Sequence, residues 1–374
     1  MIFDGHAYCF PSLKGDGGFG DPNTLRRHLQ HAMANHHAQV RRMRDGAPGD
    51  NSGLIDPGRG VGLESLKEAG FRAAHHGRFE WADGGEGYFK QYLPPSIADM
   101  AYPPERLIAE MDHAGVDWAL LHRTPYLGVG NDFIAGCVRA YPGRLRGLAH
   151  VEEWTVAANP DAAVQKVALA VKEMGLSGLQ FLPPQLNLYG QTGPWDAAAF
   201  RPFWDGVASL KVPVFFSLMA RQSGHHRHPS TVRAYVEELK TLVRWMERYP
   251  DVRLVLTHGF PWRLLIEGDG IVLPDELWTP FENPNLSLQL LFPIALGGTW
   301  DYPMPQVRRT IEECVRRLGA GRLMWGTDMP IVTRWWTYRQ NIDFITSYCD
   351  FLSPEELDRI MWRNTADLVG VEAG

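Results

Sequence analysis

The chain has 374 residues, of which 45% are hydrophobic, and its formal net charge is −6. This length supports a large core, whereas the mild acidity and the lack of any run of about 18 apolar residues exclude a nucleic-acid-binding surface, a polybasic membrane patch and a membrane span. Because the amino terminus lacks the features of a signal peptide and the four cysteines form no C-x-x-C pair, we expect reduced thiols and a cytoplasmic protein.

Short apolar, β-branched runs recur along the chain and alternate with amphipathic segments. The predicted strands are 1–8, 116–123, 145–153, 176–183, 212–220, 252–260, 286–292 and 323–331, and the clearest helices are 104–115, 159–174, 230–249 and 304–318. This alternation predicts a parallel sheet closed into a (β/α)8 TIM barrel. A doubly wound open sheet gives the same local pattern, but the count of eight strands favours the barrel.

Residues 14–100 do not follow the alternation. They are rich in Gly, Asp, Asn, His and Arg, with a helical portion near 23–45 and aromatic residues over 79–92. We therefore predict one domain over residues 1–374, in which 14–100 is a long insertion after the first strand. We expect this insertion to cover the mouth of the barrel.

Polar groups able to do chemistry stand at the carboxyl-terminal side of nearly every predicted strand. They are His6, Tyr8, His122, Arg123, His150, Glu152, Glu153, Gln180, Ser217, His258, Gln289 and Asp328. In a (β/α)8 barrel the active site is built at that end of the strands. Any one such group has an ordinary explanation as a strand-end polar residue, whereas so many together predict an active site.

Five segments carry a resemblance to a known family. They are Asp4-Gly5-His6, residues 103–122, Thr257-His258-Gly259, residues 325–330 (WGTDMP) and residues 364–370 (NTADLVG). A D-x-H opening combined with a G-T-D-x-P ending in an eight-strand pattern is specific, whereas either alone is weak. Over its whole length the chain resembles the amidohydrolase-related family, which includes aminocarboxymuconate-semialdehyde decarboxylase and the resorcylate-type decarboxylases.

The resemblance implies a divalent metal, zinc or manganese, held in part by His6 and Asp328, with His258 in catalysis. Tyr8 and Ser217 stand where the family places two further ligands, on the first and fifth strands. Neutral phenol and hydroxyl groups are poor metal ligands at neutral pH. The groups that remain available to complete a site are His225, His226 and His228 in the loop after the fifth strand, together with Glu152 and Glu153. Because His6 and Asp328 alone would bind a metal weakly, the altered ligand set predicts substoichiometric metal and chemistry without it, as in lactonase-type relatives of the family.

With or without a metal, we predict acid–base chemistry by Asp328, His258 and His6. Arginine suits a substrate carboxylate because its planar fork offers two donors. The predicted substrate-binding residues are Arg123, Tyr8, Ser217, Trp336 and Arg334. The predicted function is hydrolysis or decarboxylation of a small carboxylated substrate with an aromatic or conjugated ring. The alternatives are a metal-independent lactonase-type hydrolase and a barrel that binds without catalysis. We also expect a homo-oligomer, most simply a dimer.

Overall fold

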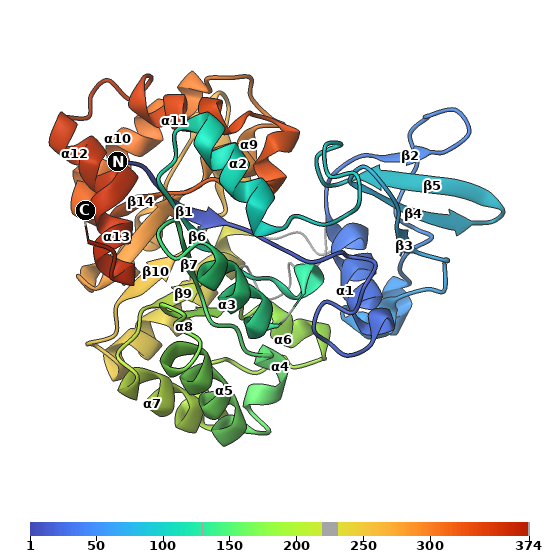
Figure 1. Ribbon diagram of the computed structural model, residues 1–374, viewed down its shortest axis with the longest axis horizontal. Helices are drawn as coiled ribbons and strands as arrows, with labels where there is room; N and C mark the ends of the chain where they lie inside the picture. Colours follow the sequence, from blue (N-terminus) through green and yellow to red (C-terminus); the bar gives the residue numbers. More distant parts are fainter. Residues whose placement is uncertain (129, 219–230, 373–374) are drawn as a thin grey trace.

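The structure is a computed structural model that describes residues 1–128, 130–218 and 231–372 (Figure 1). It places the eight predicted strands in two parallel sheets, ordered β1-β6-β7 and β14-β13-β10-β9-β8. The strands are β1 Phe3–Ala7, β6 Trp118–Leu121, β7 Leu145–Gly147, β8 Leu179–Phe181, β9 Val214–Phe216, β10 Leu254–Leu256, β13 Leu286–Leu290 and β14 Leu323–Trp325. The predicted strands and their parallel arrangement are therefore confirmed, although each strand is shorter than its predicted range.

The two sheets touch at both of their ends. An isolated parallel bridge joins Ala7 after β1 to Met329 after β14, and the backbone N–H of Tyr8 donates to Met329 O at 2.8 Å. A second parallel bridge joins Ala149 after β7 to Leu179 in β8. Each end of the three-stranded sheet is thus linked to an end of the five-stranded sheet by a single bridge.

One face of the strands is apolar at its base and polar above. A buried cluster takes one residue from each of five strands, together with the residue that directly follows β7: Phe3, Leu120, Phe215, Val255, Met324 and Leu148. Side chains two residues apart in a strand share a face. His122, His150, Ser217 and Thr257 each lie two positions after a member of this cluster. The sequence thus stacks polar groups directly above the apolar base.

Helices cover the strands, and the four clearest predicted ones are confirmed. The helices are α1 Pro22–Asn35, α2 Pro104–Ala114, α3 Asn131–Ala140, α4 Glu153–Val156, α5 Pro160–Lys172, α6 Gln185–Leu188, α7 Arg201–Ser209, α8 Val232–Arg248, α9 Phe292–Leu296, α10 Pro305–Leu318, α11 Tyr338–Thr346, α12 Pro354–Asp358 and α13 Asn364–Val369. Their ends follow local chemistry: α2 begins with proline and stops at Gly115, which adopts the left-handed conformation with φ 80°. In the described part of the chain no helix is long and apolar enough to cross a membrane, and all four cysteines are buried and unpaired.

The inserted segment forms a lobe of its own beside the strands (Figure 1). It holds an antiparallel sheet in the order β2-β5-β4-β3, whose strands are β2 Val40–Arg42, β3 Arg72–Ala73, β4 Arg78–Asp83 and β5 Glu86–Gln91. A further small hairpin outside the lobe pairs β11 Ile266–Glu267 with β12 Gly270–Ile271. The predicted helix near 23–45 is corrected: α1 ends at Asn35, because residues 40–42 pair with β5 instead.

Helix α1 connects this lobe to the loops that follow the strands. The ring of His28 lies 5.5 Å from that of Trp154, which follows β7, and His28 Nε2 lies 3.0 Å from the Tyr189 hydroxyl, which follows β8. Arg334, after β14, donates from Nη1 to the carbonyl of Tyr92 at the end of the lobe, at 3.3 Å. The lobe therefore contacts loops at the carboxyl-terminal ends of the strands.

Candidate active site

Three side chains from distant parts of the sequence meet at the carboxyl-terminal ends of the strands. His6 lies in β1, His258 follows β10 and Asp328 follows β14. Asp328 Oδ1 is 3.4 Å from His6 Nε2 and 3.3 Å from His258 Nε2. One ligand atom from each residue lies within 4.8 Å of the other two, and this is the only such group of His, Cys, Asp or Glu among the described residues. We call these three residues the His–His–Asp cluster.

Two members of the cluster hold an unusual backbone conformation. His258 has φ 62° and Asp328 has φ 72°, in the left-handed region that non-glycine residues rarely adopt. The indole N–H of Trp262 stabilises the backbone at His258 by donating to His258 O at 2.7 Å. Gly259 also has positive φ, and a Cβ there would lie 2.5 Å from the Trp262 ring. Such conformations cost about 1–3 kcal/mol each and gather at functional sites.

The surroundings set the protonation of the cluster. Burial lowers the pKa of His6 well below 6.5, and electrostatic repulsion from the neighbouring imidazoles of His122 and His258 lowers it further. Burial alone would raise the pKa of Asp328, but the His258 hydrogen bond and the charges of His258, His6 and Arg334 outweigh it and lower the pKa. His6 is therefore a neutral imidazole at neutral pH and Asp328 is a carboxylate, the states that a metal ligand requires.

A second carboxylate, Asp4, connects the segments that carry His6 and Asp328. It is fully buried and accepts from the backbone N–H of His6 at 3.0 Å, from the Thr327 hydroxyl at 2.5 Å and from the Tyr338 hydroxyl at 2.7 Å. Burial raises the pKa of Asp4 to about 6, although these hydrogen bonds oppose the shift. Asp4 thereby ties the strand that carries His6 to the turn that carries Asp328.

Tyr8 and Ser217, which stand where the family places two further metal ligands, have different hydrogen-bond partners. The Tyr8 hydroxyl is 2.9 Å from His6 Nε2, at the edge of the His–His–Asp cluster, and burial raises its pKa well above 10. It is therefore a neutral phenol. Ser217 bonds through its hydroxyl to Thr257 Oγ1, while the Thr257 hydroxyl donates to Phe216 O at 3.0 Å. Tyr8 thus touches the cluster, whereas the hydroxyl of Ser217 is committed to the neighbouring strand.

The two predicted arginines also differ. Arg123 is buried, and its guanidinium donates to the carbonyls of Gly128 at 3.1 Å and Gly130 at 2.7 Å. Arg334 is partly exposed, lies over the ring of Tyr92 at 4.9 Å and is close enough to lower the pKa of Asp328. Substrate binding stays a prediction for both, and the placement of Arg334 favours it more.

The other candidates are occupied elsewhere or are not described. The Trp336 ring packs against Tyr302 at 5.0 Å and Phe344 at 5.5 Å, so its contact with a substrate stays a prediction. Glu152 pairs with Lys166 at 2.5 Å, and Glu153 accepts from Leu182 N at 2.8 Å. The histidines 225, 226 and 228 lie outside the described residues.

Sequence reasoning missed three residues around the cluster. Gln289 in β13 contacts His6 directly, at 2.9 Å between Oε1 and Nδ1. Tyr92, from the inserted lobe, and Tyr126, after β6, join their hydroxyls at 2.9 Å, and Asp328 acts electrostatically on both. Gln289 stood among the strand-end groups but matched no family motif. Nothing in the sequence around Tyr92 indicates that it folds back toward Asp328.

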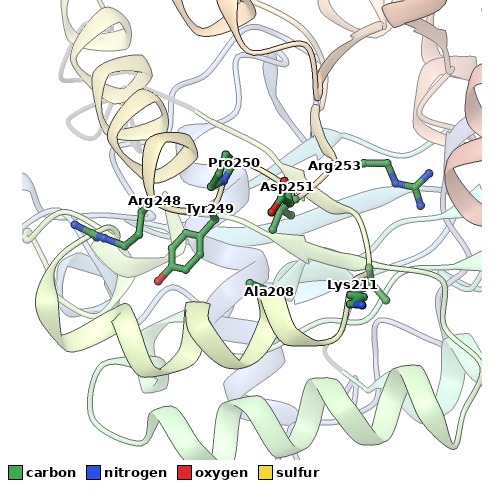
Figure 2. Close-up of a pocket in the computed structure, with 9 residues that line it drawn as sticks. Ala208, Lys211, Arg248, Tyr249, Pro250, Asp251 and Arg253 are labelled. Atoms are coloured by element: carbon green, nitrogen blue, oxygen red, sulfur yellow. The ribbon is translucent and has the colours of Figure 1, made fainter.

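A separate pocket of about 510 Å³ lies at the opposite ends of the strands, before β9 and β10 (Figure 2). Figure 2 shows Arg248 and Arg253 extending away from each other there. Arg248 donates to Asp196 O, and Arg253 donates to Asp367 O and Leu368 O, each at 3.3–3.4 Å. These cations connect structural elements, and the pocket holds none of the cluster residues.

Comparison with known proteins places this geometry in context. The sequence model of the amidohydrolase family matches residues 63–371. The gamma-resorcylate decarboxylase of Polaromonas sp. JS666 is 24% identical over 277 residues, which cover 64% of this chain and 74% of that protein. The gamma-resorcylate decarboxylase of Rhodococcus jostii RHA1 is 24% identical over 253 residues, which cover 62% of this chain and 71% of that protein.

Solved structures match in fold. The dihydroxybenzoic acid decarboxylase of Polaromonas sp. JS666, solved with bound manganese and the inhibitor 2-nitroresorcinol, has a TM-score of 0.53 and 20% identity, covering 72% of this chain and 87% of that one. The 5-carboxyvanillate decarboxylase of Sphingomonas paucimobilis has a TM-score of 0.53 and 18% identity, covering 75% of this chain and 86% of that one. At these identities the likeness shows the α/β fold alone.

Proposed function

The chain belongs to the amidohydrolase family, and from this premise we propose that it is an enzyme that decarboxylates a small carboxylated aromatic compound. The observation that carries the proposal is the meeting of His6, His258 and Asp328 at one end of the strands. The relatives favour decarboxylation over hydrolysis, since the two from Polaromonas and Rhodococcus are both gamma-resorcylate decarboxylases.

We further propose that the eight strands form a closed (β/α)8 barrel and that residues 14–100 cover its mouth. The two bridges between the sheets, at Ala7–Met329 and Ala149–Leu179, support closure. The contacts of α1 and of Tyr92 with loops after β7, β8 and β14 support the placement of the insertion. In such a barrel the cluster stands at the end where active sites are built.

The cluster fits a divalent metal, manganese or zinc. Two imidazole nitrogens and one carboxylate oxygen would be the ligands, and catalytic sites commonly use three protein ligands with one position open to water or substrate. Neutral His6 and ionised Asp328 are already in ligating form. When bound, the metal would polarise a substrate oxygen and stabilise negative charge that develops next to the ring.

The remaining residues bind and orient. His258 is the member of the cluster that a substrate meets first, because 40% of its side chain is exposed against 7% for Asp328 and none for His6. The second oxygen of the Asp328 carboxylate can take up a proton from solvent and pass it to the ring carbon that loses CO2. Arg334 brings a cation to the same mouth and would bind a substrate carboxylate or phenolate. The ring of the lobe residue Tyr92 packs against this guanidinium, 4.9 Å from ring centre to Cζ.

The proposal is tested by direct assay of the full chain, supplied in turn with manganese and with zinc. The substrates are 2,6-dihydroxybenzoate, 2,4-dihydroxybenzoate and 5-carboxyvanillate, with 2-pyrone-4,6-dicarboxylate as a hydrolase substrate. Released CO2 is followed by mass spectrometry and the ring product by chromatography. We expect CO2 together with the decarboxylated phenol. Ring opening without CO2 would show a hydrolase instead, and no turnover of any compound would contradict the proposed chemistry.

We predict that Arg334→Gln raises KM for a carboxylated substrate about tenfold while kcat changes little. The reason is that a charge-assisted hydrogen bond to a phenolate or to a second carboxylate of the substrate, outside the bond that breaks, contributes equally to the ground state and the transition state. Steady-state kinetics measure the effect, and Arg339→Gln, an exposed arginine in α11 that pairs with Asp343, is the matched control. An unchanged KM in Arg334→Gln would remove this residue from the binding site.

A further inference from the structure

The side chain of Gln289 has only one orientation that satisfies its neighbours. It is fully buried, and its Nε2 donates to the carbonyl of Gly5 at 2.8 Å. The same carbonyl accepts from His122 Nε2 at 3.0 Å. Since a carbonyl can only accept, the amide nitrogen of Gln289 must face Gly5, and the amide oxygen must face the other way.

That oxygen determines where His6 carries its proton. Gln289 Oε1 lies 2.9 Å from His6 Nδ1, and an amide oxygen can only accept, so Nδ1 is the protonated nitrogen. A neutral imidazole has one ring proton, and this contact places it on Nδ1. Nε2 therefore presents a lone pair toward the Tyr8 hydroxyl at 2.9 Å and Asp328 Oδ1 at 3.4 Å.

The opposite tautomer would otherwise have a strong partner. With the proton on Nε2, His6 could donate to the Asp328 carboxylate, and a hydrogen bond to an ionised acceptor is about twice as strong as one between neutral groups. That arrangement would bury the lone pair at Nδ1, away from the cluster. A group is needed that stabilises the Nδ1–H form, and Gln289 supplies it.

We propose that Gln289 is a positioning residue that locks His6 in the Nδ1–H tautomer and so keeps the Nε2 lone pair facing His258 and Asp328. The inference rests on the proposed function, because a metal ligand or base at His6 needs that lone pair. Histidines that bind metals commonly donate their second ring N–H to a fixed acceptor, and loss of the acceptor weakens metal binding or activity about 10–100-fold. Gln289 has this relation to His6.

The test reads the tautomer itself. The metal-free full chain is labelled with 15N-histidine, and the ring nitrogens are observed by long-range 1H–15N NMR, with His6 identified as the signal absent from His6→Gln. We expect Nδ1 to be protonated in the wild-type protein. Gln289→Leu should move the proton to Nε2, whereas Gln289→Glu, which keeps an acceptor, should leave it on Nδ1.

Gln180 gives a matched control. It is equally buried on β8, but its Oε1 accepts from Arg123 N at 2.6 Å. Gln180→Leu should therefore leave the His6 tautomer unchanged. We also expect Gln289→Leu to weaken manganese binding about 10–100-fold and Gln289→Glu to restore it.

A wild-type His6 protonated at Nε2 would overturn the inference, as would Gln289→Leu with the proton still on Nδ1 or an equal shift in Gln180→Leu. If Gln289→Leu fails to fold, Gln289→Met, which keeps the length of the side chain but also removes the amide oxygen, gives the same readout. Because the spectra need neither metal nor substrate, an inactive protein with the expected tautomer would count against the proposed function and not against the role of Gln289.

Discussion

Asp328→Asn should lower kcat/KM by roughly 10²–10⁴-fold, the usual contribution of an acid–base group, while the fold survives. Asparagine keeps the shape of the side chain but has no carboxylate to hold a proton or to bind a metal strongly. The substitution removes the negative charge of the carboxylate whose Oδ1 lies 3.4 Å from His6 Nε2 and 3.3 Å from His258 Nε2. Steady-state turnover of the substrate found in the CO2 assay measures the loss.

The control for this substitution is Asp301→Asn, which changes an exposed carboxylate and should leave kcat/KM unchanged. The circular dichroism spectrum of Asp328→Asn should match that of the wild-type protein, since the backbone need not change. Full activity in a folded Asp328→Asn protein would remove the centre of the proposed chemistry.

Removal of the divalent metal should lower activity by roughly 100-fold or more, because a bound metal contributes several kcal/mol of transition-state stabilisation. Prolonged dialysis against a strong chelator, followed by an assay in metal-free buffer, measures this loss. Added manganese or zinc should restore activity, and added magnesium, which prefers oxygen ligands over imidazole, should restore it poorly. Full turnover in chelator would favour the metal-independent alternative, with His258 and Asp328 working alone.

Much of the fold is predictable because its signals are local. Strands that are buried on both faces appear as short continuous apolar runs, and helices such as α2 and α8 appear by their spacing and caps. The strands of the inserted lobe are harder to predict from the sequence, because they are two to six residues long and pair with one another within the insertion. Its Lys90, a charged residue buried within β5, gives no pattern that marks a strand.

The candidate site was predictable where a motif marks a strand end and not where a contact depends on packing. His6, His258 and Asp328 are identified in this way, but the resemblance implies only catalysis for His258, whereas the structure places a ring nitrogen of His258 within 4.8 Å of the candidate ligand atoms of His6 and Asp328. Two groups fix His6, namely Gln289 and the carbonyl of Gly5. Their contacts depend on the register between β1 and its neighbours.

The homodimer stays a prediction, since the fold of one chain does not test it.

Titration of the metal-free full chain with manganese, followed by calorimetry, tests the central claim most directly. The claim is that His6, His258 and Asp328 form one metal site. We predict one site per chain, weakened roughly 100-fold or more in each of His6→Ala, His258→Ala and Asp328→Asn, since each removes one of three ligands. Ser217→Ala, which alters a hydroxyl bonded to Thr257, should bind as the wild-type protein does. Absent binding, or binding of unchanged affinity in all three variants, would contradict the account.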